Sequence, residues 1–165
     1  MKVSAATGMI THTVLGSPVG DLTVIADDGV VTGLYFPGHW GRPDPEKGVR
    51  DDTAFAEVAG QLGEYFAGPR TSFDVPLRAD GDGFQRAVWA EVAKVPFGGT
   101  TTYGDIAAVL GAQARDVGAA VGRNPLCVLV PCHRVVGKGG KLTGYAGGLR
   151  RKRFLLDLED RGQLW

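Results

Sequence analysis

The feature that most constrains the fold is a change of hydrophobic pattern across the polar, glycine-containing segment 78–83, near the middle of the 165-residue chain. Before this segment, short β-rich runs alternate with turn residues, whereas apolar residues recur at helical spacing after it. A polar, flexible segment between two such patterns is typical of a domain linker. The pattern therefore predicts an α+β protein with an N-terminal α/β support domain, residues 1–77, and a mostly helical domain, residues 84–165.

The N-terminal domain is expected to contain a small antiparallel sheet and one helix. Turn signals separate the β-rich runs, and the pair Asp28-Gly29 is a hairpin signal. The predicted strands are residues 10–15, 22–26, 30–36 and 72–77. A surface loop is expected at 37–48, and the capping residues 51–53 precede a helix that Gly68 and Pro69 end. The apolar stripe of this helix is Phe55, Val58, Leu62 and Phe66.

The second domain is expected to contain a helix-turn-helix. A first helix begins near Phe84 and stops at the Pro96 region. Thr102 is suited to cap a helix over 103–110, and a second helix over 114–123 ends before Pro125. After these helices, the apolar run 126–130 predicts a strand that leads to the next motif.

Charge is distributed unevenly although the whole chain is neutral. Residues 1–83 hold six basic and twelve acidic side chains, a net charge of −6, and residues 84–165 carry the opposite balance, +6. A basic half suits a polyanion such as nucleic acid, although charge that only keeps both surfaces soluble is the alternative. The second domain is therefore the candidate for contact with nucleic acid.

Composition also bounds the cellular context. No apolar run approaches the ~20 residues that a membrane-spanning helix needs, and the start of the chain lacks a signal-peptide core, so we expect a cytoplasmic protein. Two cysteines five positions apart do not indicate a disulfide framework, and Cys127 is most simply a small core residue. Residues 1–83 contain no cysteine and only His12 and His39, too few for a structural zinc site, so no metal is expected.

The most reactive motif is Cys132 followed by His133. A thiolate is the attacking form of cysteine, and it needs a nearby cation, helix N-terminus or base at neutral pH. His133 is the nearest candidate base, but neighbouring side chains on extended backbone point to opposite faces, which favours a bridging water over direct contact. The alternative for an isolated pair is a buried cysteine beside a surface histidine.

The surroundings of this pair contain a series of short motifs. In chain order, these are Phe84-Gln85 with Val88-Trp89, Pro96-Phe97-Gly98, residues 102–107, Arg123-Asn124-Pro125, residues 131–137 and residues 144–149. In this order they resemble the segments of the O6-alkylguanine-DNA alkyltransferase family, closely over residues 84–159 and loosely before them. This resemblance implies an RNase H-like N-terminal domain and a winged helix-turn-helix-like C-terminal domain that binds DNA and carries out alkyl transfer.

The resemblance implies direct-reversal DNA repair by a single-turnover methyltransferase without a cofactor. The sulfur of Cys132 would take the alkyl group from O6-alkylguanine, and whether O4-alkylthymine is also accepted stays open. Glu159 would act on Cys132 through His133 and a water, Tyr103 would assist the leaving base, and Asn124 would tie down the neighbouring turn. Taken alone, Glu159 is more typical of a solvated helix position, and Tyr103 of a half-buried core aromatic.

The same resemblance implies that the helix-turn-helix binds duplex DNA in the minor groove and that the damaged nucleotide is flipped. Arg115 would take the place of the extruded base, with a simple phosphate contact as the alternative. The DNA-contacting residues implied are Arg115, Tyr103, Gly118, Ala119 and Arg123. The implied substrate pocket comprises Cys132, Val135, Tyr145, Ala146 and Gly147. The free protein is expected to be a monomer, and cooperativity on DNA is left open.

Two departures from the family and one charged segment qualify this interpretation. Many members have serine where this chain has Ala146, and the turn 111–113 before Arg115 is about two residues shorter than in many relatives. The run 150–153 is either a phosphate-facing patch or a solvated helix face, with Lys152 its one member implied to lie near the site.

Three other functions are compatible with parts of the pattern. A non-catalytic protein that recognises alkylated DNA would share the fold, but such proteins replace the nucleophile, and Cys132 is present. A helix-turn-helix regulator would use Cys132 only as a sensor and would read an operator in the major groove. A cysteine-histidine hydrolase would turn over acyl substrates.

Overall fold

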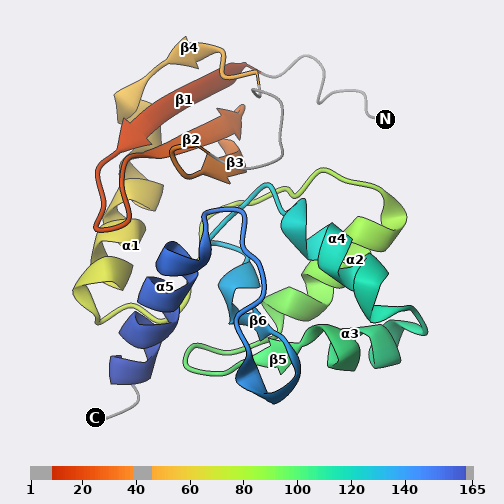
Figure 1. The fold of residues 1–165 in the computed structure, drawn as a ribbon. Helices are drawn as coiled ribbons and strands as arrows, with labels where there is room; N and C mark the ends of the chain where they lie inside the picture. Colours follow the sequence, from red (N-terminus) through yellow and green to blue (C-terminus); the bar gives the residue numbers. More distant parts are fainter. Residues whose placement is uncertain (1–8, 39–45, 163–165) are drawn as a thin grey trace.

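The computed structural model describes residues 9–38 and 46–162. Figure 1 shows a small sheet at the top, a group of helices at the right and the C-terminal helix α5 (Leu149–Gly162) at the left. The sheet has the order β3-β2-β1-β4, and a second, two-stranded sheet pairs β5 with β6 in parallel. The predicted α+β class is confirmed. His39 lies outside the described residues.

Three of the predicted N-terminal strands are present as antiparallel neighbours: β1 (Ile10–Leu15), β2 (Leu22–Asp27) and β3 (Val30–Tyr35). The expectation of a purely antiparallel sheet is wrong, because β4 (Val49–Arg50) pairs with β1 in parallel. Gly48 precedes β4 at a φ of +65°, and a Cβ there would lie 1.9 Å from the Ile10 carbonyl oxygen. Gly48 thus permits the close approach of the two backbones. The strand itself could not be predicted, because two residues are too few to show an alternating hydrophobic pattern.

The predicted N-terminal helix is confirmed. A 3₁₀ turn, Asp52–Phe55, begins where the Asp51 side chain accepts a hydrogen bond from the Thr53 backbone, and α1 (Ala56–Ala67) continues it. The helix ends at Gly68 with a φ of +115°.

The predicted strand 72–77 is wrong, since only an isolated bridge joins Leu77 to Val31. Val31 donates to the Pro76 carbonyl and accepts from Arg78, and this leaves one rung of ladder. Pro76 has no N–H with which to extend the pairing.

The second domain contains the predicted helices. α2 (Gly83–Ala93) starts one residue inside the expected linker, because Asp82 and Gln85 form a reciprocal capping box. α3 (Tyr103–Leu110) begins at its Thr102 cap and ends at Gly111, whose φ is +65°. The other elements are β5 (Thr101–Thr102), α4 (Ala114–Gly122), 3₁₀ turns at Cys132–Arg134 and Lys138–Gly140, β6 (Val135–Val136) and α5 (Leu149–Gly162).

The predicted strand over 126–130 is wrong, although the whole run is buried. Its backbone folds into tight turns in which Leu129 donates to the Cys127 carbonyl and Val130 to the Leu126 carbonyl, with Val128 at a φ of +70°. Only Leu126 forms a bridge, with Leu34 of β3. Burial explains the apolar composition here, and composition alone does not separate a buried turn from a buried strand.

The two domains share one hydrophobic core. Leu34 exchanges backbone hydrogen bonds with Pro125 and Cys127, and α5 lies beside α1 (Figure 1), where Tyr65 and Glu159 are hydrogen-bonded. The segment that precedes the cysteine and the C-terminal helix are therefore both held against the N-terminal domain. Among the described residues, no helix is long and apolar enough to span a bilayer.

Candidate functional site

Cys132 opens the 3₁₀ turn Cys132–Arg134 and is 3% exposed. Pro131 precedes the turn, and β6 follows it directly. His133, the next residue, is completely buried, so the alternative of a surface histidine is excluded. The expected extended backbone is replaced by a turn. Even so, His133 turns its Nε2 atom toward α5, and its Nδ1 atom has no hydrogen-bond partner among the described residues.

Glu159 is the acceptor around which the buried polar groups gather. It lies on α5 and is 1% exposed, which excludes a solvated helix position. His133 Nε2 lies 2.7 Å from Glu159 Oε2, while Arg134 donates from Nε to Oε1 at 2.8 Å and from Nη2 to Oε2 at 3.0 Å. A fourth hydrogen bond, of 2.6 Å, comes from the hydroxyl of Tyr65. We call His133, Arg134, Glu159 and Tyr65 the buried relay.

The pKa directions in the relay follow from burial and these contacts. Burial alone would raise the pKa of Glu159, but the hydrogen bonds from His133, Arg134 and Tyr65 outweigh it and lower the pKa to about 2. Burial lowers the pKa of His133 against the opposing effect of Glu159. At neutral pH the pair therefore consists of a carboxylate and a neutral imidazole. Because the carboxylate accepts from Nε2–H, the unprotonated ring nitrogen is Nδ1.

The thiol of Cys132 is shifted toward its reactive form. A hydrogen bond with the Cys127 side chain lowers its pKa most, and smaller contributions from Asn124 and the Lys152 charge act in the same direction. Burial opposes them and is outweighed. Cys127 is therefore more than a small core residue, because its side chain interacts with the Cys132 thiol.

Asn124 holds the turn that leads to the cysteine, as its implied role requires. Its side-chain amide donates to the Val130 carbonyl at 2.9 Å, and its oxygen accepts from the Leu126 backbone at 2.9 Å. The side chain is 1% exposed. These two bonds replace strand pairing in fixing the buried turns of 126–130.

Cys132 contributes to the wall of a cavity of about 470 Å³ between the helix-turn-helix and the segment 143–146. This size suits a small organic ligand. The residues that line it are Tyr103, Ala114, Arg115, Gly118, Val121, Gly122, Cys132, Thr143, Gly144, Tyr145 and Ala146. We call this the cysteine cavity. It brings together Cys132, Tyr103, Arg115, Gly118, Tyr145 and Ala146 from the predicted site residues.

Two predicted pocket residues lie outside that lining. Val135 is fully buried and pairs with Thr101 in the small β5–β6 sheet. Gly147 packs against the N-terminal domain: a Cβ there would lie 2.5 Å from the ring of Phe36. Gly147 therefore permits domain contact rather than adding space to the cysteine cavity.

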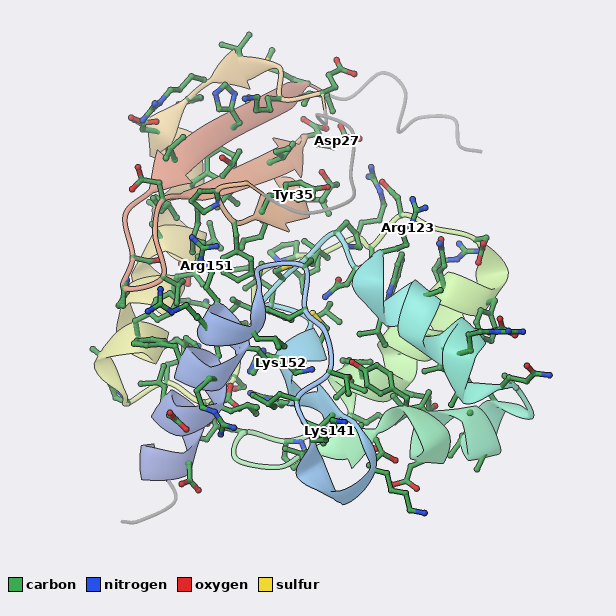
Figure 2. The ribbon with its side chains drawn as sticks, in the orientation of Figure 1. Asp27, Tyr35, Arg123, Lys141, Arg151 and Lys152 are labelled. Carbon is green, nitrogen blue, oxygen red and sulfur yellow. The ribbon has the colours of Figure 1, made fainter. Side chains whose placement is uncertain are left out.

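The helix-turn-helix presents its predicted DNA residues at different places. Arg115, the second residue of α4, is exposed at the cavity, and Gly118 lies one turn further, where a Cβ would be 3.8 Å from the Tyr103 ring. Ala119 and Arg123 are exposed but line a separate hollow with the start of α2. Figure 2 shows Arg123 at the far end of α4. The structure therefore divides this set into a group at the cavity and a group beside α2.

The basic run 150–153 is neither a uniform phosphate patch nor a solvated face. Lys152 is completely buried, its Nζ donates to the Gly144 carbonyl at 2.9 Å and lies 5.8 Å from the centre of the Tyr103 ring. Burial lowers its pKa to about 8. Arg151 donates to the carbonyls of Val19 and Gly147 (Figure 2), so it bridges the domains. Only Arg150 and Arg153 are exposed.

Sequence reasoning missed Tyr65 and Arg134 as members of the relay. Arg134 directly follows His133, in a segment that is rich in apolar residues. An arginine in such a segment is buried only when it is paired with an acid, and this could have indicated an acidic partner for Arg134. Tyr65 is 94 residues from Glu159, and it looks like one more apolar member of the α1 stripe. No local signal identifies such a contact.

Comparisons with known proteins agree with this architecture. Residues 83–161 match the model of the 6-O-methylguanine DNA methyltransferase DNA-binding domain, and residues 10–79 match the ribonuclease-like domain of the same family. A methylated-DNA–protein-cysteine methyltransferase of Mycolicibacterium paratuberculosis is 46% identical over 93% of this chain and 94% of its own length. One from Methanosarcina acetivorans is 42% identical over 90% of this chain and 97% of its own length.

A solved structure extends the agreement to the fold. The Mycobacterium tuberculosis protein OGT, crystallised in complex with DNA, superposes with a TM-score of 0.86 at 44% identity, covering 92% of this chain and 94% of that one. Both domains are thus matched by family models, and the similarity to relatives runs along nearly their full length. The chain belongs to the 6-O-methylguanine DNA methyltransferase family.

Proposed function

We propose that this protein repairs duplex DNA by moving the alkyl group of O6-alkylguanine to the sulfur of its own Cys132. The thiolate attacks the alkyl carbon, a carbon–sulfur bond forms, the bond between that carbon and guanine O6 breaks, and the base leaves as guanine after gaining a proton. Family membership supports DNA repair by alkyl transfer to a protein cysteine. The observation that carries the assignment to this residue is the position of Cys132, between the cysteine cavity and the buried relay.

The relay accounts for activation of the nucleophile. The Nε2–H group of His133 is directed at Glu159, which leaves the lone pair of Nδ1 available. This lone pair takes the proton of the Cys132 thiol through one bridging water. The carboxylate holds the ring in this tautomer and stabilises the imidazolium that forms. Hydrogen bonds from His133 and Arg134 keep the carboxylate ionised. Because a thioether is not readily reversed, each molecule transfers one alkyl group and no cofactor is needed.

The cysteine cavity is the proposed pocket for a flipped guanine. Its apolar walls and the ring of Tyr145 offer stacking surface. Tyr103 also lines the cavity, and its hydroxyl is the proposed donor to the departing base. The backbone N–H of Ala146 is the second proposed donor, and this contact tolerates the replacement of serine. The proposed role of Cys132 and Val135 as carbonyl acceptors for the guanine amino group would act through backbone adjacent to the lining.

The exposed start of α4 is the proposed reading edge for DNA. Arg115 stands at the rim of the cavity, where a planar guanidinium can fill the space of an extruded nucleotide and hydrogen-bond its partner base. Gly118 leaves the helix surface low beside Tyr103, which suits close approach of a minor-groove backbone. The net charge of +6 on residues 84–165 supports binding to DNA through this domain.

Intact mass measurement tests this function. The protein is incubated with a duplex that carries one O6-methylguanine, and any added group is located by peptide mapping. A single methyl on Cys132 with restored guanine in the DNA is the expected result. Tight binding of the duplex without a mass change would move the function to damage recognition or regulation.

A further inference from the structure

The N-terminal domain contributes Tyr65 to the buried relay. Among the described residues Tyr65 is the largest fully buried side chain, at 1% exposure, and its hydroxyl donates to Glu159 Oε2 at 2.6 Å. Burial raises its pKa above the ordinary value, so the hydroxyl is a neutral donor over the whole working range of pH. Tyr65, from the N-terminal domain, is thus an uncharged hydrogen-bond donor to Glu159, a carboxylate of the C-terminal domain.

The hydroxyl is held in place by packing of its ring. Phe66, Phe73 and Phe97 surround the Tyr65 ring at centroid separations of 5.2, 5.4 and 6.3 Å. Phe97 also lies under the Arg134 guanidinium, 5.9 Å from its centroid. The same aromatic cluster therefore orients two of the donors that converge on Glu159.

The donors share the carboxylate unequally. Glu159 Oε1 accepts from Arg134 Nε, whereas Oε2 accepts from Tyr65, His133 and the second Arg134 nitrogen. Tyr65 and His133 thus compete for the electron density of one oxygen. A strong donor on Oε2 weakens the pull of that oxygen on the imidazole proton.

We propose that Tyr65 is a positioning residue for the transfer reaction, through which the N-terminal domain fixes the Glu159 carboxylate and keeps the His133 ring a neutral base. This inference rests on the proposed function for its kinetic consequence. The charged groups that act on the His133 ring are Glu159, Arg134 and Lys152, and the Cys132 thiol is its proposed proton partner. Tyr65 acts through its hydrogen bond to Glu159. The N-terminal domain is therefore part of the machinery that sets the base, in addition to covering the core.

The test replaces Tyr65 with phenylalanine, which removes the hydroxyl and keeps the ring in its aromatic cluster. Charge then concentrates on Oε2, the ion pair with a protonated His133 strengthens, and the acidic limb of the transfer rate moves to higher pH. A shift of half a pH unit lowers the rate on that limb about threefold. The measurement is the rate constant for methyl transfer from the O6-methylguanine duplex between pH 5.5 and 8.

A second readout does not depend on transfer. The chain has three histidines, so a background with His12→Gln and His39→Gln leaves His133 as the only imidazole. Its ring ¹⁵N resonances, followed against pH, give the His133 pKa directly. The proposal requires a higher His133 pKa in the Tyr65→Phe protein than in the parent.

Two controls separate positioning from stability. Val58→Ala removes buried volume from the same helix, two turns from Tyr65, and Tyr35→Phe removes a hydroxyl on the sheet. Both should leave the acidic limb and the His133 pKa at their parent values, whatever their melting temperatures.

The outcomes distinguish the two proposals. Parent protein that transfers methyl, with a Tyr65→Phe variant of unchanged limb and unchanged His133 pKa, would overturn the role of Tyr65. If the parent transfers nothing, the proposed function fails, while a raised His133 pKa in Tyr65→Phe would still support the positioning of Glu159.

Discussion

Cys132 stands between two regions that are built in opposite ways. Behind it, His133, Arg134 and Glu159 are at most 6% exposed and are joined by hydrogen bonds of 2.7 to 3.0 Å. In front of it, Arg115 is exposed and Gly118 half-buried along an open cavity. The buried relay is complete in the free protein, whereas the cavity face is left for a ligand to fill. The groups for the proposed proton transfer are thus already in position, whereas the residues for the proposed DNA binding are exposed and able to adapt to a ligand.

Replacing Cys132 should give the largest effect, because this residue belongs to both regions. Cys132→Ala removes the proposed nucleophile, so methyl transfer should fall below detection. The small side chain leaves the cavity open, and binding of the O6-methylguanine duplex should persist. Intact mass and an electrophoretic mobility titration measure the two properties on one sample.

Retained methyl transfer in Cys132→Ala would contradict the assignment of Cys132 as the nucleophile and, with it, the comparison of the two regions around it. Cys127→Ala is the matched control, since it removes the thiol that contacts Cys132 while leaving the nucleophile. Transfer should continue in this variant, with the Cys132 pKa raised because the lost hydrogen bond favoured the thiolate.

Glu159→Gln should give the second largest effect, through the relay. The change leaves Arg134 without its ionic partner in the core, which costs roughly 3–5 kcal/mol of folding free energy. It also replaces the carboxylate, which fixes the tautomer of His133 and would stabilise its imidazolium form, with a neutral amide, so transfer should slow by about 10²-fold on duplex and free base alike. Chemical denaturation and rate constants on both substrates measure these losses.

The pH dependence of folding gives an independent reading of the same change. The Glu159 pKa is about 2 in the fold against an ordinary 4.5, so the carboxylate contributes stability above pH 4.5 and loses it as the pH falls toward 2. His133, with its pKa lowered by burial, adds a loss that begins below pH 6.5. The Glu159→Gln protein should lack the lower of these two limbs. Glu91→Gln, a change in a surface pair with Lys94, should keep both.

The sequence reveals more of the cavity face than of the buried relay. The cavity face is largely local: Thr102 caps α3, Gly111 ends it, and Arg115 follows within one turn of α4. Capping and turn residues act on backbone a few positions away, so the helix-turn-helix was predictable.

The relay was less predictable, because its members meet only through the fold. Glu159 was assigned by resemblance, whereas local composition favoured a solvated position. Tyr65 was hidden in an apolar stripe, and the run 126–130 was mistaken for a strand because burial, not pairing, sets its composition. Long-range contacts of single polar atoms leave no period or spacing behind.

Arg115→Ala probes the open region alone and should have an intermediate effect. In the proposed function Arg115 acts only when a nucleotide leaves the stack, so the variant should lose about tenfold in transfer rate on duplex DNA, equivalent to ~1.4 kcal/mol. Its rate on free O6-methylguanine base should stay within twofold of the parent. Equal losses on both substrates would assign Arg115 to the chemistry and remove the contrast. Arg150→Ala, an exposed arginine outside the cysteine cavity, is the matched control.

Asp82→Ala should have the smallest effect, and it tests whether the scaffold of the open face can weaken without touching the relay. Asp82 and Gln85 cap α2 reciprocally, and Trp89 on α2 donates to the Ala120 carbonyl of α4 at 2.8 Å. Loss of the cap should cost about 1 kcal/mol in denaturant unfolding. Because α2 does not supply a relay donor, the transfer rate on free base should be unchanged, with Asp160→Ala as a control at an exposed acid of α5. A slowed rate on free base would mean that α2 also holds the relay, and the two regions would then be one mechanical unit.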